Sequence, residues 1–269
     1  MEDKKKFNTR NPNNHLVSKE DIQQILSKGS IVEEVENISI WQRAFVHKSY
    51  VKHDDIIQNK GTVPLQSQSN ERLEWLGDAQ LQGSISSYLW KRFPNQDEGF
   101  LTKLRSKLVK TQNLSFLASR LGLSSHLLLS YHVEFSCQGR TNSRILENTF
   151  EAFIGAMFVE FENKENSSYA YKVVKTFIEN IVEKYVDIVE MLLKDDNTKD
   201  QLMWYFQKNF DGAFPVYVKE KYIQELFYII IKEPNTDKVV GRGKARSKKQ
   251  AEQNAAKNAL GYYASKDIL

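Results

Sequence analysis

Cysteine is nearly absent from this chain of 269 residues, in which Cys137 stands alone. A single cysteine excludes an internal disulfide framework and a cysteine-based zinc site. It suits a reducing compartment, so we expect an intracellular protein of the cytoplasm or the nucleus. Long apolar stretches are missing as well, and no run approaches the 18 residues of a membrane span. The net charge is only +4, so an anionic partner has to be argued from local clusters of basic residues.

What is present fits a folded protein of two parts. Apolar residues make up 41% of the chain and aromatic residues 12%, as in globular rather than disordered proteins. The length suits one large and one small domain. We expect a flexible arm over residues 1–14, a domain over 15–193, a charged linker over 194–198 and a second domain over 199–265. The lysines of the arm could touch phosphate, although a solubilising tail explains them as well.

The first candidate site lies in the segment Asn70–Ala79 (NERLEWLGDA), which places three acids among apolar residues. Glu71, Glu74 and Asp78 stand at i, i+3 and i+7, which stacks them along one face of a helix. Three like charges on one face repel each other, and a divalent cation with oxygen ligands relieves that repulsion. A solvated acidic face is the alternative interpretation, but Trp75 and the leucines leave little room for ordinary surface.

A second segment, Leu146–Ala156 (LENTFEAFIGA), is predicted to form a buried helix. Each of the two segments has a pair of small residues at which the helices could cross: Gly77 with Ala79, and Gly155 with Ala156. The crossing would gather four oxygen-bearing side chains around one or two cations: Glu74, Asp78, Asn148 and Glu151. Two cations roughly 3.5–4 Å apart are a common device for hydrolysing a phosphodiester.

The segment Asn70–Leu81 (NERLEWLGDAQL) resembles the signature of the ribonuclease III family, whose members cut double-stranded RNA. Three further segments agree with the family in order and spacing: Arg43–Tyr50, Pro94–Lys107 and Glu147–Ala156. The resemblance covers roughly residues 15–265. It implies an all-α ribonuclease III endonuclease domain and a divalent-metal-dependent endoribonuclease, using Mg²⁺ with Mn²⁺ as a substitute, that acts in RNA processing.

The resemblance also implies roles for particular residues. The predicted catalytic residues are Glu71, Glu74, Asp78, Asn148 and Glu151, of which the last four would be the metal ligands. Cations held there would activate a water and stabilise the departing 3′ oxygen. The expected products carry a 5′-phosphate, a 3′-hydroxyl and two-nucleotide 3′ overhangs. Neither a membrane nor a small-molecule cofactor is expected.

Two further positions take their predicted roles from the same family. A homodimer is implied because each site cuts one strand of a duplex, and Trp75 matches the position that inserts into the partner subunit. Simple core packing is the alternative for Trp75. Glu98 matches an acid at the rim of the cleavage groove, although on chemistry alone it could cap the next helix. A basic amphipathic helix over 101–119 fits RNA contact and a solvated face equally well.

The second domain changes its periodicity. A helix over 199–209, strands over 214–220, 226–232 and 238–243, and a helix over 247–263 are predicted. This small α+β (α-β-β-β-α) order resembles the double-stranded RNA-binding domain. Ser247 would cap the last helix, whose dipole attracts phosphate. The predicted RNA-binding residues are Glu98, Gln207, Lys244, Arg246, Ser247, Lys248 and Lys249.

Two departures from the family pattern matter. Asn148 stands where the family usually has an aspartate, so we expect reduced or altered metal affinity. An inactive family member serving as an RNA-binding or ribosomal structural protein is the alternative that this residue keeps open. The predicted loop Glu220–Glu225 (EKYIQE) lacks the family's Gly-Pro-x-His element. We therefore expect phosphate contacts to dominate RNA binding and to make it strongly salt-dependent.

Overall fold

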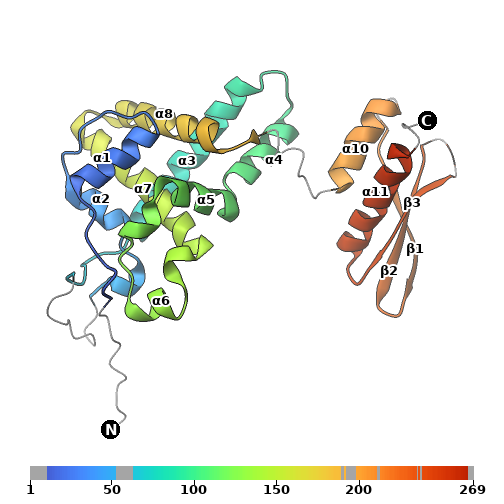
Figure 1. Cartoon of the computed structure of the whole chain (residues 1–269). Coiled ribbons are helices and arrows are strands. Elements are labelled where there is room, and N and C mark those ends of the chain that lie inside the picture. The colour runs from blue at the N-terminus through green and yellow to red at the C-terminus, as the bar shows by residue number, and fades with distance from the viewer. Residues whose placement is uncertain are drawn as a thin grey trace, which may run out of the picture. The chain divides into compact units, whose positions relative to one another are not determined.

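The computed structural model describes residues 11–52, 63–188, 191, 198–210, 213–234, 236 and 238–265, without the side chains of residues 204, 207 and 208. The chain divides into two compact units, Met1–Asp187 and Ile188–Leu269 (Figure 1), and each is described by itself. The predicted linker over 194–198 lies outside the described residues apart from Thr198, which begins the first helix of the second unit.

The first unit is built from helices, as predicted. Its α-helices are α1 (Lys19–Lys28), α2 (Ile38–Ala44), α3 (Glu71–Arg92), α4 (Glu98–Leu108), α5 (Thr111–Leu121), α6 (Tyr131–Phe135), α7 (Ser143–Lys164) and α8 (Ser167–Tyr185). The described connections include the 3₁₀ turns η1 (Lys48–Tyr50), η2 (Leu123–His126) and η3 (Gly139–Thr141). The prediction of a single basic helix over 101–119 is wrong, because the helix is interrupted between Leu108, where α4 ends, and Thr111, where α5 begins. None of the described helices has the length and apolar character needed to cross a membrane.

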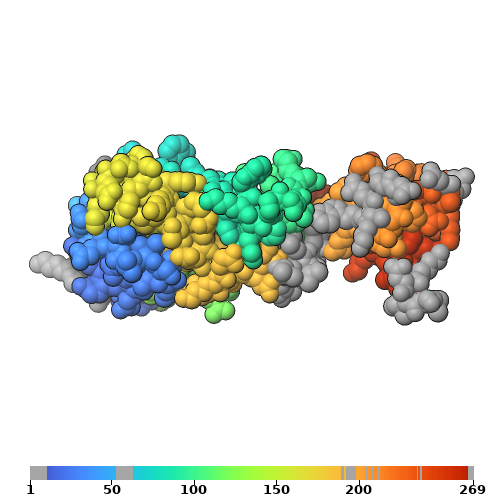
Figure 2. Space-filling view, turned by 90° about the horizontal axis from the view of Figure 1, so that it is seen from above, coloured from blue at the N-terminus to red at the C-terminus, as the bar shows by residue number. Residues whose placement is uncertain are grey.

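Helix α7 forms the centre of the first unit. It packs against α3, and α2, α5 and α8 also contact it. A central helix must be apolar on nearly all sides, and α7 buries twelve of its residues, including the aromatic side chains of Phe150, Phe153 and Phe161. Figure 2 shows the surface of the first helices, in blue, against that of the later helices, in yellow. The packing of α7 against α3 holds in place the two helix backbones that carry the predicted acids.

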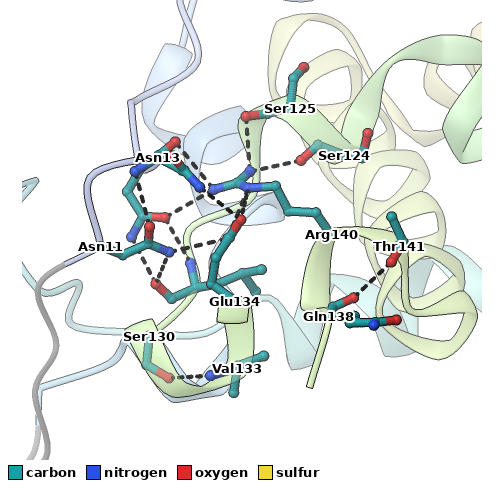
Figure 3. A network of polar contacts seen from close by, with 12 residues as sticks. Asn11, Asn13, Ser124, Ser125, Ser130, Val133, Glu134, Gln138, Arg140 and Thr141 are labelled. Atoms are coloured by element: carbon teal, nitrogen blue, oxygen red, sulfur yellow. Dashed lines mark hydrogen bonds and ion pairs between the residues drawn. The ribbon is translucent and has the colours of Figure 1, made fainter. Parts of the chain in front are cut away.

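Residues 11–14 belong to this helical unit rather than to the predicted flexible arm. The side-chain amides of Asn11 and Asn14 both donate to the carbonyl of Leu129, each at 3.0 Å. Arg140 forms an ion pair with Glu134 at 2.9 Å in the same network (Figure 3). The prediction of an arm is therefore wrong for residues 11–14, where buried amides need partners, and residues 1–10 lie outside the described part.

The second unit has the predicted α-β-β-β-α order. Its elements are α10 (Thr198–Asn209), β1 (Val216–Ile223), β2 (Leu226–Lys232), β3 (Val239–Ala245) and α11 (Lys248–Ala264). The strands form an antiparallel sheet in the order β1-β2-β3. Both helices pack on one face, around Leu202, Phe206 and Ile231. Gly241 and Gly243 let β3 approach α11, because a methyl group at Gly243 would lie 2.2 Å from the Ala251 carbonyl oxygen.

The connection between β1 and β2 differs from the prediction. Residues 220–223 continue β1, so the predicted loop Glu220–Glu225 shrinks to a two-residue turn at Gln224 and Glu225. Both turn residues have positive φ, 51° and 59°, a conformation that two-residue hairpins need and that glycine or asparagine usually supplies. The hairpin leaves no room for a longer groove-entering loop at this point.

Candidate metal and RNA-binding sites

The predicted acids lie where α3 crosses α7, and two glycines make the crossing close. A methyl group at Gly77 would lie 1.7 Å from the Glu151 carbonyl oxygen, and one at Gly155 would lie 2.1 Å from the Leu73 carbonyl oxygen. Only glycine permits such backbone contact. The crossing predicted at Gly77 and Gly155 is confirmed. Ala79, by contrast, is exposed and takes no part in it.

The crossing places Glu151 among other carboxylates. Burial raises its pKa to about 8, with further contributions from the negative charges of Asp78, Glu147 and Glu74. Each of these charges disfavours a second ionised carboxylate nearby. Glu151 thus holds a proton at neutral pH unless a positive charge arrives. A bound cation would relieve this repulsion.

Glu74 feels the same field from the other helix. Burial raises its pKa, and Glu71 and Glu147 raise it further, while Lys48 and a hydrogen bond from the Asn148 side chain act in the opposite direction. Glu74 and Asn148, predicted from separate segments, are therefore in contact. Glu71 is turned outward, where it pairs with Lys48 at 3.5 Å and accepts a hydrogen bond from the Ser69 hydroxyl at 3.0 Å.

Glu147 was missing from the predicted site. It is half-buried one turn before Glu151 on α7, and its charge acts on both Glu151 and Glu74. The i, i+4 spacing of the two glutamates was a readable signal. Glu147 stands directly before Asn148, so this helix carries a carboxylate one position away from the place where the resemblance expects one.

The donor set suits a hard divalent cation. Glu74, Asp78, Asn148 and Glu151 offer carboxylate and amide oxygens, which are the ligands that Mg²⁺ and Mn²⁺ prefer. Within the described residues, no three acidic, histidine or cysteine side chains already stand close enough together to hold one ion. Ligation of one ion by these residues would therefore need their side chains to rotate on backbones that the glycine crossing holds in place.

Two other predicted residues of the helical unit are Trp75, on α3, and Glu98, on α4. Trp75 is 77% exposed between Glu74 and Leu76, so the alternative of simple core packing is wrong. Glu98 is the exposed first residue of α4 and accepts a hydrogen bond from the Thr102 hydroxyl at 2.8 Å. Asp97, rather than Glu98, caps that helix. Asn70 stands at the N-cap position of α3, a place that suits asparagine, but its side chain makes no cap hydrogen bond.

Apart from Gln207, the predicted RNA-binding residues of the second unit lie at the start of α11. The Ser247 hydroxyl accepts a hydrogen bond from the Gln250 amide at 3.2 Å, so the predicted cap is confirmed. Four exposed basic side chains surround this helix end: Lys244, Arg246, Lys248 and Lys249. The Lys248 ammonium lies 3.9 Å from Glu252. Gln207 lies in α10, with its side chain outside the description.

Comparisons with known proteins agree with this arrangement of parts. Residues 37–181 match the family described as Ribonuclease-III-like, and residues 198–263 match the double-stranded RNA binding motif. A "Probable ribonuclease 3" of Acanthamoeba polyphaga mimivirus is 34% identical over 98% of this chain and 49% of its own length. A "Ribonuclease 3" of Staphylococcus aureus is 32% identical over 83% of this chain and 85% of its own length.

Among solved structures, the chain is similar to the nuclease domain of ribonuclease III from Campylobacter jejuni. That similarity has 28% sequence identity and a TM-score of 0.48, and it covers 62% of this chain and 96% of the other. The family match spans more than half of the chain. The chain therefore belongs to the ribonuclease III family, and it spans about half the length of its mimivirus relative.

Proposed function

We propose that this chain is an endoribonuclease that cuts double-stranded RNA with the help of divalent metal ions. One observation carries the proposal: the Gly77–Gly155 crossing brings acids of two separate segments so close that the pKa of Glu151 rises to about 8. A structural helix pair gains nothing from such repulsion. A nuclease gains a place to bind metal.

The residues of the crossing would have different roles in metal binding. Glu74, Asp78, Asn148 and Glu151 would hold the metal, and Mg²⁺ or Mn²⁺ bound there would supply Lewis-acid chemistry at the scissile phosphate. Glu151 has to release its proton to act as a ligand. Glu147 adds negative charge next to Asn148, whose amide brings none. The expected products carry a 5′-phosphate, a 3′-hydroxyl and two-nucleotide 3′ overhangs.

The second unit would contribute most of the affinity for the RNA duplex. Lys244, Arg246, Lys248 and Lys249 surround a capped helix N-terminus, and both the charges and the helix dipole attract phosphate. The first strand connection is a two-residue turn without the Gly-Pro-x-His element of the family. Binding would therefore depend on phosphates and on duplex shape.

A homodimer would complete the nuclease. Trp75 is a large apolar side chain, 77% exposed, on the same helix as the acids, and burial of such a side chain favours association. Two copies would place one acidic site on each strand. Sedimentation of wild type and Trp75→Ala tests this, and a wild type that stays monomeric in the presence of duplex RNA contradicts it.

The proposed activity is tested by incubating a long RNA duplex with purified protein and Mg²⁺. We expect cleavage, and a loss of about 100-fold or more in Glu151→Gln, the size of effect that removal of one transition-state contact produces. A Mg²⁺ titration and end analysis of the products test the metal and the cut. Intact RNA in both reactions favours the alternative that Asn148 suggests, an inactive RNA-binding member of the family.

A further inference from the structure

A hollow of about 380 Å³ lies beside the acidic crossing, between α2, η1 and the first turn of α3. Its polar lining consists chiefly of Arg43, Lys48, Ser67, Ser69, Glu71 and Arg72. Among the described lining residues, three side chains are basic and one is acidic, so this part of the lining carries a net positive charge. The hollow therefore differs in charge from the carboxylates that begin one turn farther along α3.

Among the residues that the structure describes, neither arginine of this hollow has an ion-pair partner. Burial lowers the pKa of the Arg43 guanidinium, and the charge of Arg72 lowers it further, so the two cations feel each other directly. The Nε of Arg43 donates to the Ser69 carbonyl at 3.1 Å, which fixes the guanidinium in place. In the described part of the chain, no ion pair neutralises Arg43 or Arg72, whereas Lys48 is paired with Glu71.

The N-terminus of α3 opens onto the same hollow. Asn70 does not cap this helix with its side chain, because its amide group donates to the Ala44 carbonyl at 3.2 Å instead. The Glu71 amide has only a long contact of 3.4 Å to the Ser69 hydroxyl. The Leu73 and Glu74 amides both donate to the Asn70 carbonyl at 2.9 Å, so this helix end offers the amides of Glu71 and Arg72 and the positive end of the helix dipole. These add to the field of the two arginines.

We propose that this hollow is an anion site that receives a backbone phosphate of the RNA strand being cut. Guanidinium groups and free helix amides are the groups that bind phosphate in proteins. Glu71 lies both in the hollow and one turn from Glu74, so a phosphate held here lies beside the acidic site. The identity of the RNA rests on the proposed function, whereas the anion site does not.

The test compares Arg72→Gln with Arg120→Gln in the full-length protein. Both arginines are exposed, so both variants remove one surface charge and leave the core intact, which matching Tm values verify. Binding to an RNA duplex is measured in EDTA over a series of salt concentrations. We expect Arg72→Gln to weaken binding about tenfold and to lower the slope of log K against log salt by about 1. In cleavage assays with Mg²⁺, Arg72→Gln should raise KM and leave kcat nearly unchanged. Arg43→Lys should lose less RNA affinity than Arg72→Gln, because lysine keeps the positive charge but lacks the planar guanidinium group.

The possible outcomes separate this site from the proposed activity. If Arg72→Gln and Arg120→Gln bind RNA equally well and with equal salt slopes, the phosphate site is wrong even where the wild type cuts RNA. If the wild type leaves RNA intact but Arg72→Gln still weakens binding, the anion site stands and the nuclease proposal fails. The last measurement is the rise in Tm of the protein on addition of inorganic phosphate. If Arg72→Gln abolishes this rise yet binds RNA as the wild type does, the assignment to an RNA phosphate is overturned.

Discussion

The acids of the helical unit and the lysines of the second unit are held in opposite ways. Glu74 and Glu151 sit half-buried on two helices whose backbones touch at Gly77. Lys248 and Lys249 are exposed on the first turn of α11. The first pair is kept in an unfavourable place by backbone packing. The second pair needs only a helix N-terminus, which tolerates long side chains reaching into solvent.

On the proposed function, the difference reflects what each region would do, since the first would bind metal and the second would bind RNA phosphates. A metal site needs ligands in fixed positions, so the fold must offset their repulsion before any ion arrives. A grip on the phosphate backbone of a duplex needs charge, reach and tolerance of sequence. Substitutions at the crossing should therefore affect folding and chemistry together, whereas substitutions at the start of α11 should affect RNA affinity alone.

The largest effect is expected from Gly77→Ala. Its methyl group would lie 1.7 Å from the Glu151 carbonyl oxygen, so the helices must separate, and unfolding free energy should fall by about 2–4 kcal/mol. Gly83→Ala is the matched control on the same helix, since the nearest atoms, in Tyr171, lie 3.9 Å away. That variant should gain up to about 1 kcal/mol. Urea unfolding measures both, and equal stabilities would show that the crossing is not tight.

The double variant Lys248→Ala/Lys249→Ala should reduce RNA affinity strongly and leave stability unchanged. Loss of two phosphate contacts lowers the slope of log K against log salt by about 2. Lys257→Ala, an exposed change farther along α11, should change neither affinity nor slope. Fluorescence anisotropy with a labelled duplex measures all three proteins. An unchanged affinity in the double variant would contradict the predicted binding of RNA phosphates by Lys248 and Lys249.

Glu151→Gln should stabilise the protein at alkaline pH. The folded-state pKa of Glu151, about 8, lies above the ordinary value near 4.5, so its contribution to stability is complete below about pH 4.5 and is lost as pH rises to about 8. Glutamine does not titrate. In a chelating buffer the variant should match wild type near pH 4.5 and exceed it by about 1–2 kcal/mol at pH 8, allowing for partial solvent screening. Glu165→Gln, exposed after α7, is the control, and parallel stability curves for wild type and Glu151→Gln would contradict the expected pH dependence.

The smallest effect is expected from Asn148→Asp. It adds a carboxylate beside Glu74 and removes the hydrogen bond that Asn148 donates to it. Extra ligand charge strengthens the binding of hard cations, so the Mg²⁺ midpoint of cleavage should fall by about twofold to tenfold. If the substitution changes neither the rate nor the midpoint, the ligand role of Asn148 is wrong.

Much of the crossing could be predicted because its signals are local. The helical spacing predicted a helix in each of the segments Asn70–Ala79 and Leu146–Ala156, and these segments lie in α3 (Glu71–Arg92, with Asn70 as the residue before it) and α7 (Ser143–Lys164). The pairing of Gly77 with Gly155 followed from small residues on both segments. Glu147 was not predicted, although its i, i+4 spacing to Glu151 is visible in the sequence, because the resemblance assigns the ligand role to its neighbour Asn148.

Other features depended on contacts between distant parts of the chain. Asn70 suits an N-cap, yet its side chain binds the Ala44 carbonyl. Asn11 and Asn14 sit in a polar stretch, yet the Leu129 carbonyl and Glu134 hold them. In each case a buried carbonyl or carboxylate far along the chain supplied the partner, and local propensity contains no information about it.

The sequence alone determined which residues are acidic or basic, where they recur along a helix, and that an α-helical unit precedes a small sheet. Those properties follow from short-range periodicity and capping. Tertiary structure alone decided that Glu151 keeps a proton to about pH 8, that Trp75 faces solvent, and that Arg43 and Arg72 share a hollow. Burial and electrostatic coupling arise only when separate segments meet, since both depend on distance in space rather than along the chain.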